Sequence, residues 1–137
     1  MNYSTWEARI SSARQKDPLW RMRAYRLATY LSTITWHDAS KLARCRVTTE
    51  ISPQLYKAVG SITSNMSEGY SRSSGRDRAR IFEYALGSAR ESREWYWRAE
   101  PVLGAMDDRQ ELLDEVIRLL VVTIPREREV IIEPGRY

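Results

Sequence analysis

The sequence predicts an all-α protein that folds as an up-down-up-down antiparallel four-helix bundle. Apolar residues recur at spacings of three and four along four stretches, which is the period of an amphipathic helix. Capping residues and prolines mark the starts and ends of these stretches, and most connections between them are short. A chain of 137 residues is long enough to bury one such core without disulfides or metals.

The first helix is expected from Asp17 to about Trp36. Asp17 is a favourable N-cap, and Pro18 takes the first helical position, where its missing N–H is harmless. The apolar stripe of this helix consists of Trp20, Ala24, Leu27, Leu31 and Ile34. Residues 38–50 are open to two interpretations, because residues 39–46 either continue the helix or form a short separate one.

The second helix is expected to begin at Ser52 and Pro53, again a cap followed by proline, and to end near Tyr70. Gly69 is interpreted as the mark of its end. Its buried face is expected to consist of Leu55, Ala58 or Val59, Ile62, Met66 and Tyr70.

A polar turn over residues 71–75 leads to the third helix, which is expected over residues 76–100. Its shared face consists of Phe82, Ala85 or Leu86, Ala89 and Tyr96. Pro101 falls beyond this helix, and residues 104–107 are expected to form a loop.

The fourth helix is expected to be capped by Asp107 or Asp108 and to be ended or kinked by Pro125. Its stripe consists of Leu113, Val116 or Ile117, Leu120 and Ile124. The chain is thus divided into an N-terminal extension (1–16), the bundle (17–125) and a C-terminal tail (126–137). The tail is expected to form either a further helical turn or a short extended arm.

Composition excludes several classes of function. Cys45 is the only cysteine and His37 the only histidine, so an internal disulfide, most zinc or di-iron sites and most histidine-dependent catalysis are excluded. No cofactor and no metal are expected. The sequence has no apolar run near the ~20 residues of a membrane span and no secretion signal at its start. A cytoplasmic location is therefore expected, with no membrane partner.

The charge is uneven along the chain. The first 100 residues hold 17 Lys and Arg against 10 Asp and Glu, whereas residues 101–137 hold 5 against 8, which gives the net charge of +4. Of the basic residues, 19 are arginine and only 3 are lysine. Arginine binds phosphate bidentately and stacks on bases, so this bias is typical of a nucleic-acid or acidic-protein surface. Arginines that simply fill solvated positions are the alternative.

Arginines and aromatic residues are grouped around the second turn and the third helix. The predicted nucleic-acid-binding residues are Arg72, Arg76, Arg78, Arg80, Arg90 and Arg93. The aromatic residues nearby are Tyr70, Tyr84, Trp95, Tyr96 and Trp97. This mixture suits RNA or single strands better than duplex reading. Trp95 and Trp97 point about 200° apart, so at least one is expected to be exposed and to anchor a subunit or partner contact.

Small and polar residues interrupt the second and third helices. Ser64, Asn65 and Glu68 are interpreted as a structural polar cluster, with Glu68 held by an arginine. A catalytic serine at Ser64 is the alternative, but it lacks a nearby base, so no catalytic residue and no enzymatic activity are expected. Gly60, Gly87 and Ser88 predict a close helix crossing, either within the bundle or between subunits.

Two segments carry a resemblance to the four-helix bundle protein family. This family includes proteins encoded by intervening sequences within bacterial 23S ribosomal RNA genes and the accessory variability proteins of diversity-generating retroelements. The matching residues are Gln54, Leu55, Ala58, Ser61, Ile62, Asn65, Glu68 and Gly69, followed by Gly87, Ser88 and Glu91. Thr63 and Ser67 depart from the family pattern, which has proline and alanine there, and residues 17–28 resemble its opening helix.

The resemblance implies a non-enzymatic bundle that assembles as a homo-oligomer, a pentameric ring or barrel. Its accessory-variability branch implies a basic protein that binds RNA, or an RNA/DNA hybrid, together with a reverse transcriptase. That branch supports mutagenic cDNA synthesis. The arginine excess favours this branch, and the alternative is an intervening-sequence-type scaffold that binds proteins without nucleic acid.

Overall fold

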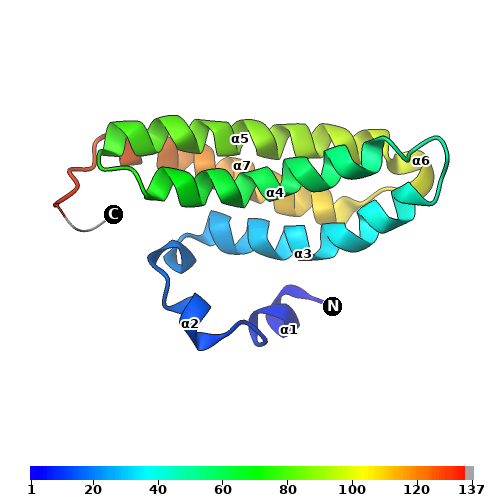
Figure 1. The fold of residues 1–137 in the computed structure, drawn as a ribbon, viewed down its shortest axis with the longest axis horizontal. Coiled ribbons are helices and arrows are strands. Elements are labelled where there is room, and N and C mark those ends of the chain that lie inside the picture. Colours follow the sequence, from blue (N-terminus) through cyan, green and yellow to red (C-terminus); the bar gives the residue numbers. More distant parts are fainter. Residues whose placement is uncertain (135–137) are drawn as a thin grey trace.

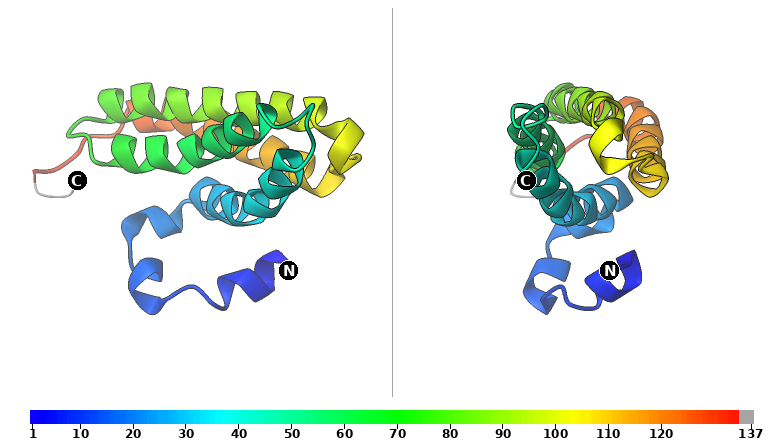
Figure 2. Two further views of the ribbon diagram at one scale, coloured as in Figure 1. Left: turned by 45° about the vertical axis from the view of Figure 1, so that its right-hand side comes forward. Right: turned by 90° about the vertical axis from the view of Figure 1, so that its right-hand side faces the viewer.

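The four long helices lie side by side in the computed structural model, which describes residues 1–134 (Figure 1). They are α3 (Arg23–Ala43), α4 (Ile51–Tyr70), α5 (Gly75–Arg98) and α7 (Asp107–Arg128). Each packs against the next long helix along the chain, and α7 packs back on α3, so that the four enclose one core (Figure 2). The described part is all-helical, as predicted, and forms a helical bundle.

Four shorter elements complete the described chain. Two short helices, α1 (Tyr3–Glu7) and α2 (Ser12–Gln15), precede a 3-10 helix, η1 (Pro18–Arg21). A single turn, α6 (Glu100–Leu103), joins α5 to α7 and ends at Gly104, the one described residue with a positive φ (77°). None of the described helices combines the length and the apolar character needed to cross a membrane.

The predicted apolar stripes form the core. Leu31, Ile62, Phe82 and Leu120, one from each long helix, are fully buried. The other stripe residues are buried as well, except Tyr70 and Leu86, which are half-buried. The three-and-four spacing therefore located the buried faces correctly on all four helices.

The first long helix differs from the prediction at both ends. Asp17 does act as a cap, because its Oδ1 accepts from Leu19 N at 3.0 Å, but it caps η1. Extended backbone at Met22 (ψ 112°) separates η1 from α3, which therefore begins at Arg23. At the other end, residues 39–43 continue α3, whereas residues 44–46 are not helical, so the first interpretation is confirmed as far as Ala43.

Two predicted caps are wrong. Ser52 lies inside α4, and its Oγ donates to the carbonyl of Ala39 on α3 at 2.6 Å, because its side chain is buried between the two helices. Asp107 and Asp108 lie in the first turn of α7, after an N-cap at Met106 without a side-chain cap. Carboxylates in a first turn still stabilise the helix through its dipole.

Gly69 and Pro125 do not end their helices. α4 continues to Tyr70, and Gly69 has helical backbone; a Cβ there would lie 2.8 Å from the ring of Phe82. Within the described bundle the close helix crossing is therefore at Gly69, because a Cβ at Gly60 or Gly87 would meet no atom within 4 Å. A close crossing between subunits at Gly60, Gly87 and Ser88 remains a prediction. Pro125 is inside α7, which runs on to Arg128. Beyond it, residues 129–134 are not helical, and residues 135–137 of the predicted tail lie outside the described residues.

The N-terminal segment packs back on the bundle. Trp6 is buried, with its ring centroid 5.9 Å from that of Trp20 and 5.4 Å from that of Tyr30. The Tyr30 hydroxyl donates to the carbonyl of Met1 at 3.0 Å. The division of the chain into extension, bundle and tail remains a prediction.

Candidate nucleic-acid interface

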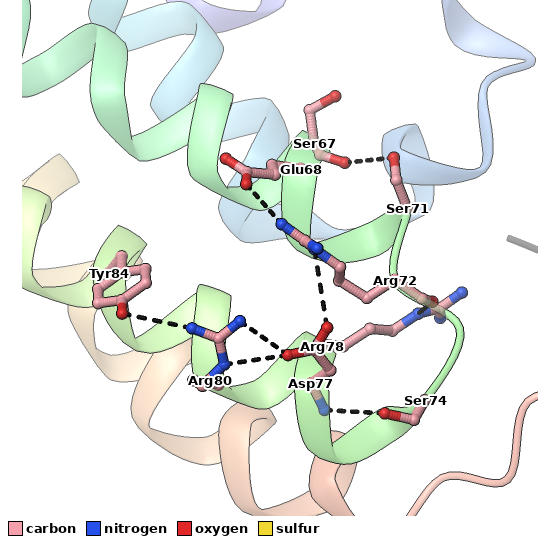
Figure 3. A network of polar contacts seen from close by, with 9 residues as sticks. All are labelled: Ser67, Glu68, Ser71, Arg72, Ser74, Asp77, Arg78, Arg80 and Tyr84. Atoms are coloured by element: carbon pink, nitrogen blue, oxygen red, sulfur yellow. Dashed lines mark hydrogen bonds and ion pairs between the residues drawn. The ribbon is translucent and has the colours of Figure 1, made fainter.

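The turn between α4 and α5 is built by serines. Ser74 is the N-cap of α5, and its Oγ accepts from the backbone N–H of Asp77 at 3.1 Å. Ser71 Oγ donates to the carbonyl of Ser67, one turn earlier on α4, at 2.9 Å (Figure 3). Gly75 follows the cap, and a Cβ there would lie 2.2 Å from the carbonyl oxygen of Glu127. The turn is therefore held tightly against the end of α7.

Two of the predicted arginines join an ion-pair network at this turn. Arg72 Nη2 lies 2.7 Å from Glu68 Oε1, so an arginine holds Glu68 as expected. Arg80 Nη2 lies 2.9 Å from Oδ1 of Asp77, whose Oδ2 is 3.8 Å from Arg72 Nε (Figure 3). The hydrogen bond that Arg80 Nε donates to Asp77 Oδ1 raises the pKa of Arg80. Both arginine side chains remain at least one-third exposed, and such surface ion pairs are weak.

Arg78 was predicted to bind nucleic acid, but it is buried in the structure. Its side chain pairs with Glu127 at 3.3 Å and lies with its guanidinium carbon 4.3 Å from the centroid of the Tyr70 ring. Its Nε donates to the carbonyl of Arg72 at 3.3 Å. Arg78 therefore ties the α4–α5 turn to α7, and an exposed nucleic-acid surface does not include it.

Arg76 and Arg90 lie on the outer side of α5. Both are exposed, and neither forms an ion pair with any residue in the described part of the chain. They are fourteen residues apart, or roughly 21 Å along a helix, with Gly87 on the same side. Two carboxylates, Glu83 and Glu94, share this side, and Glu83 pairs with Arg128 at 2.7 Å. The outer side of α5 is thus mixed in charge, and Arg76 and Arg90 form no ion pair with a described residue.

Arg93 points toward α7. Its Nη1 lies 3.0 Å from Asp114 Oδ1, and its guanidinium carbon is 5.1 Å from the Trp97 ring centroid. Trp97 is 45% exposed, so the expectation of an exposed tryptophan is confirmed. Trp95 is half-buried, and its Nε1 donates to Glu91 at 3.1 Å. The structure therefore brings arginine and aromatic side chains together, but on two sides of α5.

The serine and asparagine of the polar cluster bond to their own helix. Ser64 Oγ donates to the carbonyl of Ser61 at 3.3 Å, and Asn65 Nδ2 donates to the same oxygen at 2.8 Å. Ser64 is exposed, and no basic side chain of the described residues bonds to it. Within residues 1–134, no three His, Cys, Asp or Glu side chains are close enough to hold a metal ion.

A buried polar network was not predicted from the sequence. The Tyr96 hydroxyl lies 2.6 Å from Asp38 Oδ2 and 2.9 Å from Thr35 Oγ1. Arg109 Nε donates to the same Asp38 oxygen at 3.0 Å. Burial raises the pKa of Tyr96, and the negative charge of Asp38 raises it further. One signal was present, since Asp38 continues the stripe of Leu31 and Ile34 at helical spacing.

A protein-family model matches most of the chain. The family model of the 23S rRNA-intervening sequence protein matches residues 21–122, well over half of the chain. No curated protein matches, and neither does any solved structure. The matched region covers the four long helices except for the last turns of α7. The chain therefore belongs to the 23S rRNA-intervening sequence protein family.

Proposed function

We propose that this protein is a non-enzymatic accessory protein that binds RNA, or an RNA/DNA hybrid, through the outer side of α5. The single observation that supports this proposal is the exposure of Arg76 and Arg90 without an ion-pair partner in the described chain. Guanidinium groups without a carboxylate partner are free to bind phosphate bidentately. Arg72 and Arg80 lie at one end of the same surface, and their exposed pairs with carboxylates can exchange for phosphate.

Arg93 and the aromatic residues extend this proposal. Trp97 and Tyr84 are exposed, and each has an arginine guanidinium within 6.0 Å of its ring centroid. Exposed aromatic rings provide stacking surfaces for the bases of single-stranded nucleic acid, and neighbouring arginines attract its phosphates. Arg93 is half-buried against Asp114 and is therefore a peripheral contact in this account.

The wider role is proposed from the resemblance to the accessory variability proteins. In this role the protein assembles as a homopentamer and binds a reverse transcriptase during mutagenic cDNA synthesis in the cytoplasm. An exposed aromatic pair supports a subunit or partner contact: Trp36 is 59% exposed and packs at 5.6 Å on Tyr56, which is 40% exposed. We also propose the up-down-up-down path for the four long helices, which their packing in chain order supports.

The test is RNA binding measured across a salt series. The double variant R76Q/R90Q removes two phosphate contacts, so the slope of log K against log salt should become shallower by about 1.4 for single-stranded RNA. The matched control is R44Q/R46Q, which removes the same charge from the α3–α4 loop, at the end of the bundle opposite the α4–α5 turn (Figure 1). Equal effects of the two double variants would show a general charge effect instead of a surface on α5.

The second candidate function is a protein-interaction scaffold that does not bind nucleic acid. The exposed Trp36–Tyr56 pair favours it, because aromatic side chains dominate the binding energy of protein interfaces. Three results would favour the scaffold over the RNA-binding protein. The protein would capture its partner equally well at low and high salt, W36A/Y56A would no longer capture it, and R76Q/R90Q still would.

A further inference from the structure

A cavity lies at the end of the bundle where α3 begins. Its volume is about 490 Å³, and it is lined by residues of η1, α3, α4, α5 and α7. Three arginines line it, namely Arg21, Arg23 and Arg78, against one carboxylate, that of Glu127. Glu127 is already paired with Arg78 at 3.3 Å. Arg23 is also paired, with Glu115 at 3.7 Å, but its side chain is 58% exposed and such a surface pair is weak. Arg21 forms no ion pair with any described residue, so the lining carries more positive than negative charge and is suited to an anion.

The start of α3 adds hydrogen-bond donors to the same cavity. Met22, Arg23 and Ala24 line it, and the N-cap Met22 makes no side-chain cap. No acidic residue lies in the first turn, and no described residue accepts from the backbone N–H groups of Arg23, Ala24 and Tyr25. Unpaired N–H groups at the positive end of a 21-residue helix attract an anion.

Arg78 provides a second and independent indication. The residue is 6% exposed, it lines the cavity, and its Nη2 has no hydrogen-bond partner in the described structure. A buried guanidinium N–H without an acceptor is costly, and such groups in native proteins are usually satisfied by a bound ion, ligand or water. Its Nη1 and Nε are already used by Glu127 and by the carbonyl of Arg72.

We propose that this cavity binds the phosphate group of a ligand. The phosphate accepts from the N-terminal N–H groups of α3 and is bound by Arg21 and Arg23, with Arg78 Nη2 as a further donor. The apolar lining, which includes Met22, Leu119 and Val130, packs against the organic part of the ligand. The site is separate from the outer side of α5 and does not depend on the RNA-binding proposal.

The first experiment titrates inorganic phosphate against the full chain at constant ionic strength, with chloride as the balancing ion. We expect a saturable rise in the melting temperature, as mass action requires for a ligand that binds only the folded state. In the R21Q/R23Q variant the apparent Kd should weaken at least tenfold. Both arginines are exposed, so this variant is expected to fold. The control R44Q/R46Q should bind phosphate like the wild type.

A second measurement needs no variant. Phosphate should shift the backbone amide resonances of Arg23, Ala24 and Tyr25 in the wild-type protein, with the same midpoint as the thermal titration. Any of three results would overturn the proposal. They are a melting temperature that rises without saturating, equal responses of the wild type and both variants to phosphate, and no movement of the three amide resonances.

The source of the phosphate is then distinguished by competition. The competitors are a 5′-phosphorylated oligonucleotide and its 5′-hydroxyl counterpart. If the phosphorylated one displaces inorganic phosphate at a concentration at least tenfold lower, the ligand is the phosphorylated end of a nucleic-acid chain. Equal weak displacement by both oligonucleotides, with inorganic phosphate still bound, would identify a small phosphorylated molecule.

Discussion

The hydroxyl of Tyr96 lies 2.6 Å from Oδ2 of Asp38, although the two residues are 58 positions apart in the sequence. Arg109 binds the same carboxylate, so one buried acid connects α3, α5 and α7. A buried carboxylate is tolerated only where it is paired and hydrogen-bonded, and this network meets that condition. The network fixes which faces of the three helices meet, in a way that the apolar stripes alone do not.

Replacing Tyr96 with phenylalanine should destabilise the protein by about 1–3 kcal/mol, because Asp38 would lose one donor while remaining buried. The free energy of unfolding in urea is the measurement. Y84F is the matched control. Tyr84 is exposed, so removing its hydroxyl should lower the free energy of unfolding by less than about 0.5 kcal/mol. A similar cost for both variants would mean that the buried hydrogen bond contributes nothing specific.

The same hydroxyl predicts the pH dependence of stability. The pKa of Tyr96 is raised above its ordinary value of 10.0, so the folded state keeps this proton at a pH where the unfolded state has lost it. The stabilisation is complete below about pH 10 and decreases as the pH rises above that value. The decrease should approach about 1.4 kcal/mol per pH unit for this one proton. The alkaline unfolding profile of Y96F should be shallower by that amount, and identical profiles would contradict the account.

Gly69 is expected to tolerate no side chain. In G69A the new Cβ would lie 2.8 Å from two ring carbons of Phe82 and 3.2 Å from Ile81 Cβ, so the buried ring must shift. We expect a loss of about 1–3 kcal/mol in the free energy of unfolding. The control is G60A, which meets no atom within 4 Å and should be more stable than wild type by about 0.5–1 kcal/mol. A stabilised G69A would show that α4 and α5 do not approach closely there.

Trp6 is expected to hold the N-terminal segment on α3. W6A removes a buried ring that contacts Trp20 and Tyr30, and the segment can detach without unfolding the bundle. Limited trypsin digestion should therefore cleave after Arg9 or Arg14 at least tenfold faster in W6A. W97A is the control, because Trp97 is exposed and lies on α5. Unchanged cleavage in W6A would mean that the segment is held by other contacts.

Sequence reasoning located the four helices and their buried faces, because side-chain periodicity is a local property. It failed at the caps, where Ser52 bonds to Ala39 on another helix instead of to its own helix start. It also assigned Arg78 to the surface, because nothing local shows that Glu127, 49 residues later, reaches it. Partners distant in the sequence, such as Asp38 and Tyr96, depend on how the helices pack.

In the candidate site, too, the local pattern was predictable from the sequence and the contacts between distant residues were not. The grouping of arginines around the second turn was visible in the sequence, but their pairing was not. Arg72, Arg80 and Arg93 meet carboxylates in the structure, whereas Arg76 and Arg90 meet none among the described residues. Helical spacing places Arg76 and Arg90 on one side of α5, so this part of the site was predictable once the helix was known.

The most direct test of the central claim is the salt dependence of RNA binding by the wild type, R76Q/R90Q and R44Q/R46Q. The account predicts that R76Q/R90Q binds RNA more weakly and with a slope shallower by about 1.4, while the control keeps the wild-type slope. Wild-type protein that binds no RNA at low salt, or a slope that is unchanged in R76Q/R90Q, would contradict it.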